Sequence, residues 1–84
     1  QSSAKKKIIE SAAELYVTDH KNKIIITSGN CYIDVQTLVN EHYLSSDELK
    51  DSDGKEMRGA VSYNASNNSY DYSPQPNPSN KCIE

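Results

Sequence analysis

The feature that most restricts the fold of this chain is its pair of cysteines, Cys31 and Cys82, which are widely separated in only 84 residues. Cys82 lies near the end of a Pro-rich segment, "YSPQPNPSNKCIE", whose composition is typical of tails that fray unless they are attached. Domains of this size bury a modest core and often need a cross-link. The even cysteine count therefore predicts a Cys31–Cys82 disulfide and an oxidising compartment. The alternative is two unrelated buried thiols in a cytosolic protein.

Composition limits the classes of partner. The chain has 35% hydrophobic residues, six tyrosines and neither Trp nor Phe, and its net charge is −3. This acidic balance argues against a general nucleic-acid binder, and Lys5–Lys7 form the one basic cluster. We find no apolar run long enough to span a membrane and no signal peptide, so an exported chain would have been processed or trimmed. Residues 1–3 resemble a cloning remnant or a cut edge.

Residues 4–20, "AKKKIIESAAELYVTDH", predict an amphipathic helix that reaches about Asp19. Lys5–Lys7 would lie in its first turn, where the helix dipole disfavours positive charge. We therefore expect the native helix to begin further upstream. The apolar stripe expected to face the sheet is formed by Ile8, Ala12, Leu15 and Tyr16, with Ile9 and Ala13 widening it.

The middle of the chain predicts a short strand and a second helix. The β-branched run Ile24–Ile26 favours a strand, and Ser28–Asn30 has turn composition. The segment "CYIDVQTLVNEHYLSS" then predicts a short helix with Asp34 as its N-cap. Ser45–Ser46 would end this helix or cap a further turn over Asp47–Leu49. One face of the helix would carry Val35, Leu38, Val39 and His42.

Alternating tyrosines near the C-terminus predict a β-hairpin. Val61–Tyr63 and Tyr70–Tyr72 would pair, with the turn-rich segment Asn64–Ser69 at the tip. Together with the strand at Ile24–Ile26, the hairpin would form a three-stranded sheet against the first helix. The predicted fold is a single α+β domain over residues 1–84, with a long N-terminal helix, a small antiparallel sheet, a short second helix and a disulfide-tied tail.

No arrangement of residues predicts catalysis or a cofactor. His20 and His42 have neither metal-ligand spacing nor a CxxC partner, and a Cys–His nucleophile would require a reduced cysteine. We interpret His42 as a half-buried face residue and His20 as a polar residue near a helix end. "DSDGKE" places Asp51 and Asp53 as in the start of a calcium loop, but it lacks the complete EF-hand pattern, and an acidic turn is the simpler interpretation.

Other polar and aromatic groups have alternative interpretations. Lys5–Lys7 could contact phosphate or an anionic membrane, although a solvated helix face is the simpler interpretation. Tyr63, Tyr70 and Tyr72 could stack on bases or sugars, or could cover the core. Asn64 and Asn67 each begin a glycosylation sequon, a match that arises easily by chance in an Asn- and Ser-rich hairpin tip.

The helix-first layout, followed by "GNCYIDVQTLVNEHYLSSDELKDSDGKEMRGAVSYN", resembles the soluble head of a type IV pilin or pseudopilin of the kind found in Gram-positive bacteria such as clostridia. The resemblance extends from about Ala4 to Tyr72. It implies that residues 4–20 are the C-terminal half of the pilin helix, that residues 21–84 form the head, and that an apolar N-terminal half of the helix is missing.

The resemblance implies a structural subunit of an extracellular, surface-attached filament, without enzymatic activity or cofactor. Its partners would be other pilin subunits and, through the missing helix, the membrane assembly machinery. The filament-facing residues would be Ile8, Ile9, Ala12, Ala13, Leu15 and Tyr16. Two alternatives stay open: a competence or type II secretion pseudopilin, and a small secreted binding module that forms no filament.

Overall fold

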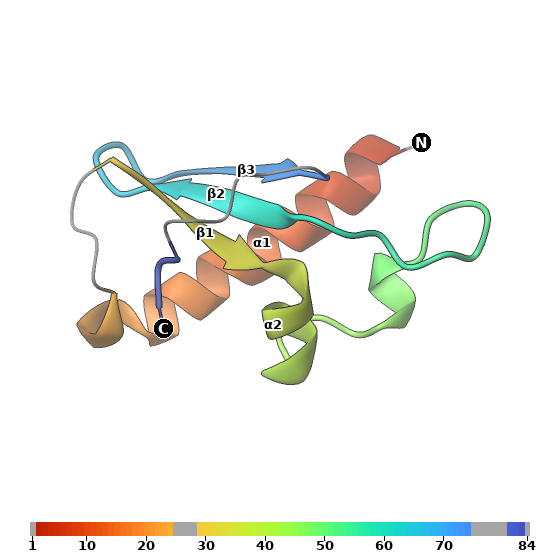
Figure 1. The fold of residues 1–84 in the computed structure, drawn as a ribbon, viewed down its shortest axis with the longest axis horizontal. Coiled ribbons are helices and arrows are strands. Elements are labelled where there is room, and N and C mark those ends of the chain that lie inside the picture. Colours follow the sequence, from red (N-terminus) through yellow and green to blue (C-terminus); the bar gives the residue numbers. More distant parts are fainter. Residues whose placement is uncertain (1, 25–28, 75–80, 84) are drawn as a thin grey trace.

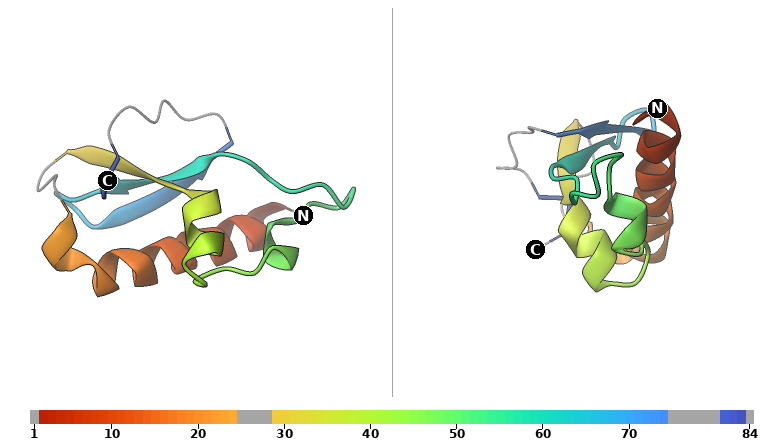
Figure 2. Two further views of the ribbon diagram at one scale, coloured as in Figure 1. Left: turned by 60° about the horizontal axis from the view of Figure 1, so that its bottom comes forward. Right: turned by 90° about the vertical axis from the view of Figure 1, so that its right-hand side faces the viewer.

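The computed structural model describes residues 2–24, 29–74 and 81–83 and shows an α+β fold in two layers (Figure 1). Helix α1 (Ser2–Asp19) covers one face of an antiparallel sheet, as Figure 2 shows from two further directions. The sheet contains β1 (Asn30–Asp34), β2 (Ala60–Asn64) and β3 (Ser69–Ser73), in that order. Helix α2 (Val35–Asn40) and the 3-10 turn η2 (Asp47–Leu49) pack beside α1. Another 3-10 turn, η1 (Lys21–Lys23), follows α1 in the chain.

Helix α1 ends at Asp19, as predicted, but its buried face is rotated relative to the predicted stripe. Ile9, Ala12, Ala13, Tyr16 and Val17 are buried, and their three- and four-residue spacing forms a single stripe. The prediction that Ile8 and Leu15 face the sheet is wrong, because these side chains are 40% and 59% exposed. Apolar residues lie on so much of the circumference of α1 that their spacing in the sequence does not determine which face packs against the sheet.

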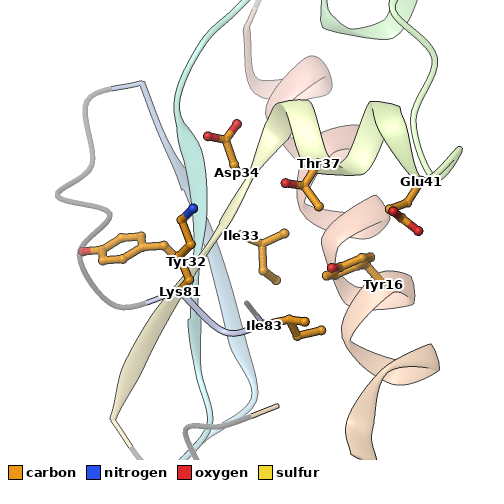
Figure 3. Close-up of a pocket in the computed structure, with 8 residues that line it drawn as sticks. All are labelled: Tyr16, Tyr32, Ile33, Asp34, Thr37, Glu41, Lys81 and Ile83. Atoms are coloured by element: carbon orange, nitrogen blue, oxygen red, sulfur yellow. The ribbon is translucent and has the colours of Figure 1, made fainter. Parts of the chain in front are cut away.

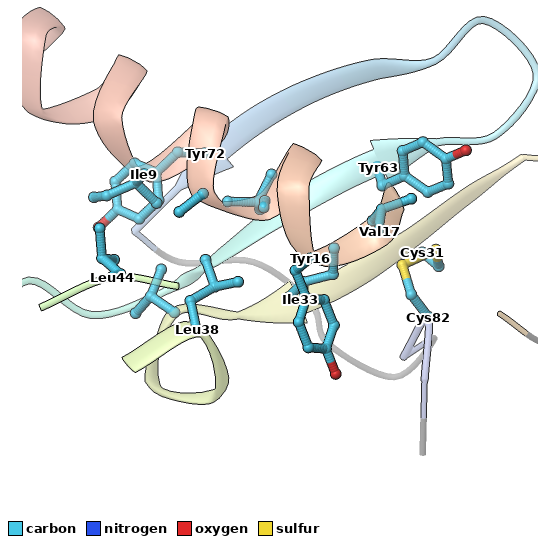
Figure 4. Packing of buried hydrophobic residues seen from close by; sticks show 14 of the residues in the cluster. Ile9, Tyr16, Val17, Cys31, Ile33, Leu38, Leu44, Tyr63, Tyr72 and Cys82 are labelled. Carbon is cyan, nitrogen blue, oxygen red and sulfur yellow. A yellow bond between two sulfur atoms is a disulfide. The ribbon is translucent and has the colours of Figure 1, made fainter. Parts of the chain in front are cut away.

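The hairpin prediction is confirmed, and each strand extends one residue beyond the predicted segment at both ends. Val61 pairs with Tyr72 and Tyr63 with Tyr70, so these four side chains share the face that meets α1. The rings of Tyr63 and Tyr70 stack with centroids 4.9 Å apart. Figure 4 shows Tyr63 and Tyr72 in the buried cluster together with Ile9 and Val17.

Strand β1 was not predicted, because its residues were assigned to the start of the second helix. Cys31 and Ile33 are buried while Asn30 and Asp34 are exposed, which is the alternation of a half-buried strand. Cys31 lies opposite Tyr63, and Ile33 lies opposite Val61. The strand predicted at Ile24–Ile26 lies outside the described residues except for Ile24, which is partly buried and belongs to no strand.

Helix α2 begins as predicted but ends early. The Asp34 side chain accepts a hydrogen bond from the Gln36 amide at 2.8 Å, so Asp34 is the N-cap. The helix ends at Asn40 because His42 adopts a left-handed conformation with φ 68°. His42 is exposed and lies beyond the end of α2, so the prediction of a half-buried position on the helix face is wrong. Ser45 and Glu48 cap η2 reciprocally, which confirms the predicted further turn.

The C-terminal segment is attached to the free edge of β1. Cys82 forms the predicted disulfide with Cys31, and both residues are fully buried (Figure 4). The Cys82 amide donates to the Tyr32 carbonyl at 3.0 Å, and Lys81 forms a parallel bridge with Tyr32. The tail therefore covers backbone groups that an edge strand would otherwise expose.

Candidate functional site

One surface suited to a partner is the side of α1 that faces away from the sheet. Among the described residues, Ile8 and Leu15 are the large hydrophobic residues that are exposed to solvent. They are seven residues apart, so they lie on one side of the helix two turns from each other, with Ser11 between them. We call the strip formed by Ile8, Ser11 and Leu15 the outer strip of α1.

The outer strip borders a shallow groove of about 330 Å³ between α1 and the segment that follows α2. Tyr43 and Leu44 form the opposite wall, with Lys7 and Glu48 also on the lining. Leu44 is buried, whereas Tyr43 is partly exposed and is fixed by its hydroxyl, which donates to Asp19 Oδ2 at 2.6 Å. This hydrogen bond and burial raise the pKa of Tyr43 to about 12, so the hydroxyl stays protonated at neutral pH.

The basic cluster Lys5–Lys7 does not form one patch. Lys5 Nζ donates to the backbone carbonyls of Asp47 and Glu48 at 3.5 and 3.4 Å. Lys6 Nζ pairs with Asp71 at 3.1 Å and Glu10 at 3.9 Å, and these partners raise its pKa. Lys7 alone of the three lines the groove. Lys6 and Lys7 are exposed and Lys5 is partly exposed, which agrees with the interpretation as a solvated helix face.

The residues considered for catalysis are not brought together. Cys31 and Cys82 are bonded to each other, so neither is available as a thiol nucleophile. The His20 ring packs on Tyr16 with centroids 4.4 Å apart, and its Nδ1 lies 2.8 Å from the Tyr16 carbonyl oxygen at the end of α1. His42 is exposed beyond α2. His20 thus has a structural contact that the sequence pattern did not reveal.

The acidic turn at Asp51–Glu56 is organised by its own hydrogen bonds. Asp51 Oδ1 accepts from the backbone amides of Asp53 and Lys55 at 2.9 and 3.1 Å. This carboxylate oxygen therefore closes the turn. Within the described ranges, no group of three or more His, Cys, Asp or Glu side chains is placed to hold a metal ion.

The hairpin tyrosines cover the core, which confirms that interpretation. Tyr63 and Tyr72 are buried, and Tyr70 is partly buried. Burial, with Tyr63 and Glu14 nearby, raises the pKa of Tyr70 to about 12. Of the two sequon asparagines, Asn64 donates to Asn30 at 3.2 Å, while the exposed Asn67 accepts from the Ser69 amide.

Comparison of the chain with protein-family models, with curated proteins and with solved structures finds no match. In the part of the chain that the structure describes, no helix has the length and apolarity that a membrane span requires.

Proposed function

We propose that this chain is the head of a structural subunit of an extracellular type IV pilus or pilus-like filament. The observation that carries the proposal is the two-sided character of α1. One side packs under the sheet through residues such as Ile9 and Tyr16, while the other presents Ile8 and Leu15 to solvent. Such a helix can complete a folded head and also contact a neighbouring subunit.

The disulfide-tied tail supports an extracellular location for the head. The Cys31–Cys82 bond persists in oxidising compartments, and it fixes a C-terminal segment that would otherwise be held by few backbone contacts. In this proposal, an apolar segment preceding α1 anchors the subunit in the membrane before assembly. The head acts as a structural unit and performs no chemistry of its own.

We expect the isolated head to be monomeric, with a mass near 9.4 kDa by light scattering. Two exposed side chains on one helix supply little of the roughly 1,200 Å² or more of total buried surface that stable complexes need. Filament assembly would therefore need the preceding segment as well as the outer strip.

The decisive experiment changes the outer strip in the full-length gene. Ile8→Glu together with Leu15→Glu should abolish surface fibres that an antibody to the head labels by immunogold, while the isolated variant head keeps its stability to urea. Ser52→Glu, in the exposed acidic turn, is the matched control and should leave the fibres intact. Cytoplasmic labelling, or normal fibres in the double variant, would reject the proposal.

A further inference from the structure

A second concave site lies beside α1, between α2, β1 and the C-terminal segment (Figure 3). Its volume is about 230 Å³. Tyr16 reaches it from α1, Thr37 from α2, Glu41 from the C-cap of α2, Ile33 from β1, and Ile83 from the segment that the disulfide holds in place. We call it the Tyr16 pocket; it shares none of the residues of the outer strip.

The Tyr16 hydroxyl is the feature that points to a ligand. Tyr16 is only 6% exposed, yet its hydroxyl has no hydrogen-bond partner among the described residues. No fully buried polar side-chain atom of the described residues lacks a partner, so the Tyr16 hydroxyl keeps some contact with solvent, and Tyr16 is one of the residues that line the pocket. A largely buried tyrosine usually finds a partner for this group, and here the open position is available to a bound molecule.

The Tyr16 ring packs against two other rings. The Tyr16 ring packs against His20 at a centroid distance of 4.4 Å and meets the edge of Tyr43 at 5.4 Å. Burial, and secondarily the charge of Glu41, raises the pKa of Tyr16, so the group is a neutral hydroxyl that can accept or donate. A ligand would therefore meet a preorganised group, and binding would require little ordering of Tyr16.

Helix α2 presents further oxygen acceptors to the same pocket. Asp34, Thr37 and Glu41 follow one another at three- and four-residue spacing, which aligns them on one side of the helix and its cap. Asp34 uses one carboxylate oxygen for the N-cap, whereas the side chains of Thr37 and Glu41 make no hydrogen bond or ion pair within the described residues. Figure 3 shows Thr37, Glu41 and Tyr16 on one side of the pocket and Lys81 on the other, next to Tyr32.

We propose that the Tyr16 pocket binds a primary ammonium group carried on an aliphatic chain. An ammonium has three donors and no acceptor, which matches the Tyr16 and Thr37 hydroxyls and the Glu41 carboxylate. The carboxylates of Asp34 and Glu41 outnumber the Lys81 ammonium, so the lining favours a cation. Ile33 and Ile83 offer aliphatic surface to the methylene chain, and the volume is below that of pockets for drug-sized ligands.

The same chemistry can come from a free alkylamine or from a lysine side chain of a protein, including a second copy of this chain. The inference concerns the pocket alone and holds whether or not the chain forms filaments. Each source makes the same ammonium contact, so one set of variants tests both.

The test is an NMR titration of the ¹⁵N-labelled, disulfide-bonded chain with 1,4-diaminobutane at constant pH and ionic strength. We expect saturable shifts of the Thr37, Glu41 and Ile83 amides in the millimolar range. Glu41→Gln should weaken binding about tenfold or more, and Tyr16→Phe about fivefold, as expected for a charged and a neutral hydrogen bond. Glu14→Gln, an exposed carboxylate outside the pocket, should not change it.

The neutral analogue 1,4-butanediol should not saturate the same amides. A lysine side chain as the source is tested by titration with Nα-acetyl-lysine methylamide. Binding of a second copy is tested by dilution of the chain without ligand. If the amides of the pocket shift with chain concentration, and if this dependence is lost after lysine acetylation, the ammonium belongs to a second copy. The absence of saturable shifts with either amine, or equal affinities in the chain and in Glu41→Gln, would overturn the proposal. Tyr16→Phe should fold normally, because the hydroxyl that it removes has no partner in the described structure.

Discussion

Removal of the Cys31–Cys82 bond should cost this domain a large share of its stability. The two cysteines are 51 residues apart, so the bond closes a loop that includes β2, β3 and all of β1 except Asn30. In the chain-entropy model, closing a loop of this length lowers the conformational entropy of the unfolded chain. The resulting gain in the free energy of unfolding is about 4 kcal/mol, a value that depends on the model. Small domains hold roughly 5–15 kcal/mol in total.

The disulfide also holds the C-terminal segment in place. Apart from the bond, the Cys82 amide hydrogen bond to Tyr32 and the Lys81 bridge attach the segment to β1. Without the disulfide, we expect the segment to detach and to expose part of the Ile83 side chain, which packs on the core. Amides of residues 81–83 should then exchange rapidly, while those of the β2–β3 hairpin remain protected.

Urea unfolding of Cys31→Ala, Cys82→Ala and the double variant measures the effect. Each single change already breaks the bond, so each should cost about 3–5 kcal/mol, and the double variant should cost much less than the sum. Alkylation of the unreduced wild-type chain, followed by mass spectrometry, should find no free thiol. Additive losses, or a loss below about 1 kcal/mol in the double variant, would refute the reasoning from loop closure.

Three further predictions concern the core, a close backbone approach and alkaline pH. Ile9→Ala should lose about 2–5 kcal/mol because Ile9 is fully buried, whereas Leu15→Ala should lose no more than about 0.5 kcal/mol; similar urea midpoints would contradict the assignment of the two faces of α1. Gly59→Ala should lose more than about 2 kcal/mol, because φ is +122° and the new Cβ would overlap the Ser73 carbonyl; thermal unfolding checks this, and a neutral result would contradict it. The pKa of Tyr70 is raised from 10.0 to about 12, so the stability linked to its neutral form is complete below pH 10 and is lost as pH rises through 12. Across this pH window, the urea midpoint of Tyr70→Phe should fall less steeply with pH than the midpoint of the unchanged chain. Equal slopes would contradict the raised pKa of Tyr70.

The sequence identified the existence of α1 and the hairpin better than it identified their packing. Alternation in Val61–Tyr63 and Tyr70–Tyr72 matched a sheet with one buried face, so both the elements and their pairing were predictable. In α1, the stripe that contains Ile9 and Val17 and the stripe that contains Ile8 and Leu15 are both apolar. The sheet selects one of them, and that choice depends on tertiary packing.

Strand β1 shows why a short segment between two helical patterns is difficult to assign. The period-two signal of Cys31 and Ile33 covers only five residues, and the N-cap at Asp34 follows at once, so the helical pattern seemed to include them. The Tyr16 pocket was even less predictable, because Thr37 and Ile83 are far apart in sequence and meet only through the disulfide-held segment.

The two edges of the sheet limit how the chain could assemble in our proposal. At β1, the Tyr32 carbonyl accepts from Cys82. At β3, the Tyr72 amide donates to Glu10 on α1 at 2.7 Å. Strand edges with unpaired backbone groups can pair with strands of other molecules. The hydrogen bonds to Cys82 and Glu10 occupy such groups and so disfavour strand pairing between molecules. Assembly in our proposal therefore uses the outer strip of α1, so loss of the disulfide and loss of the strip should have opposite consequences. The Cys31→Ala/Cys82→Ala head, with the edge of β1 uncovered, should aggregate with a gain in β-structure. The Ile8→Glu/Leu15→Glu head should stay monomeric and folded, and its full-length counterpart should form no fibres.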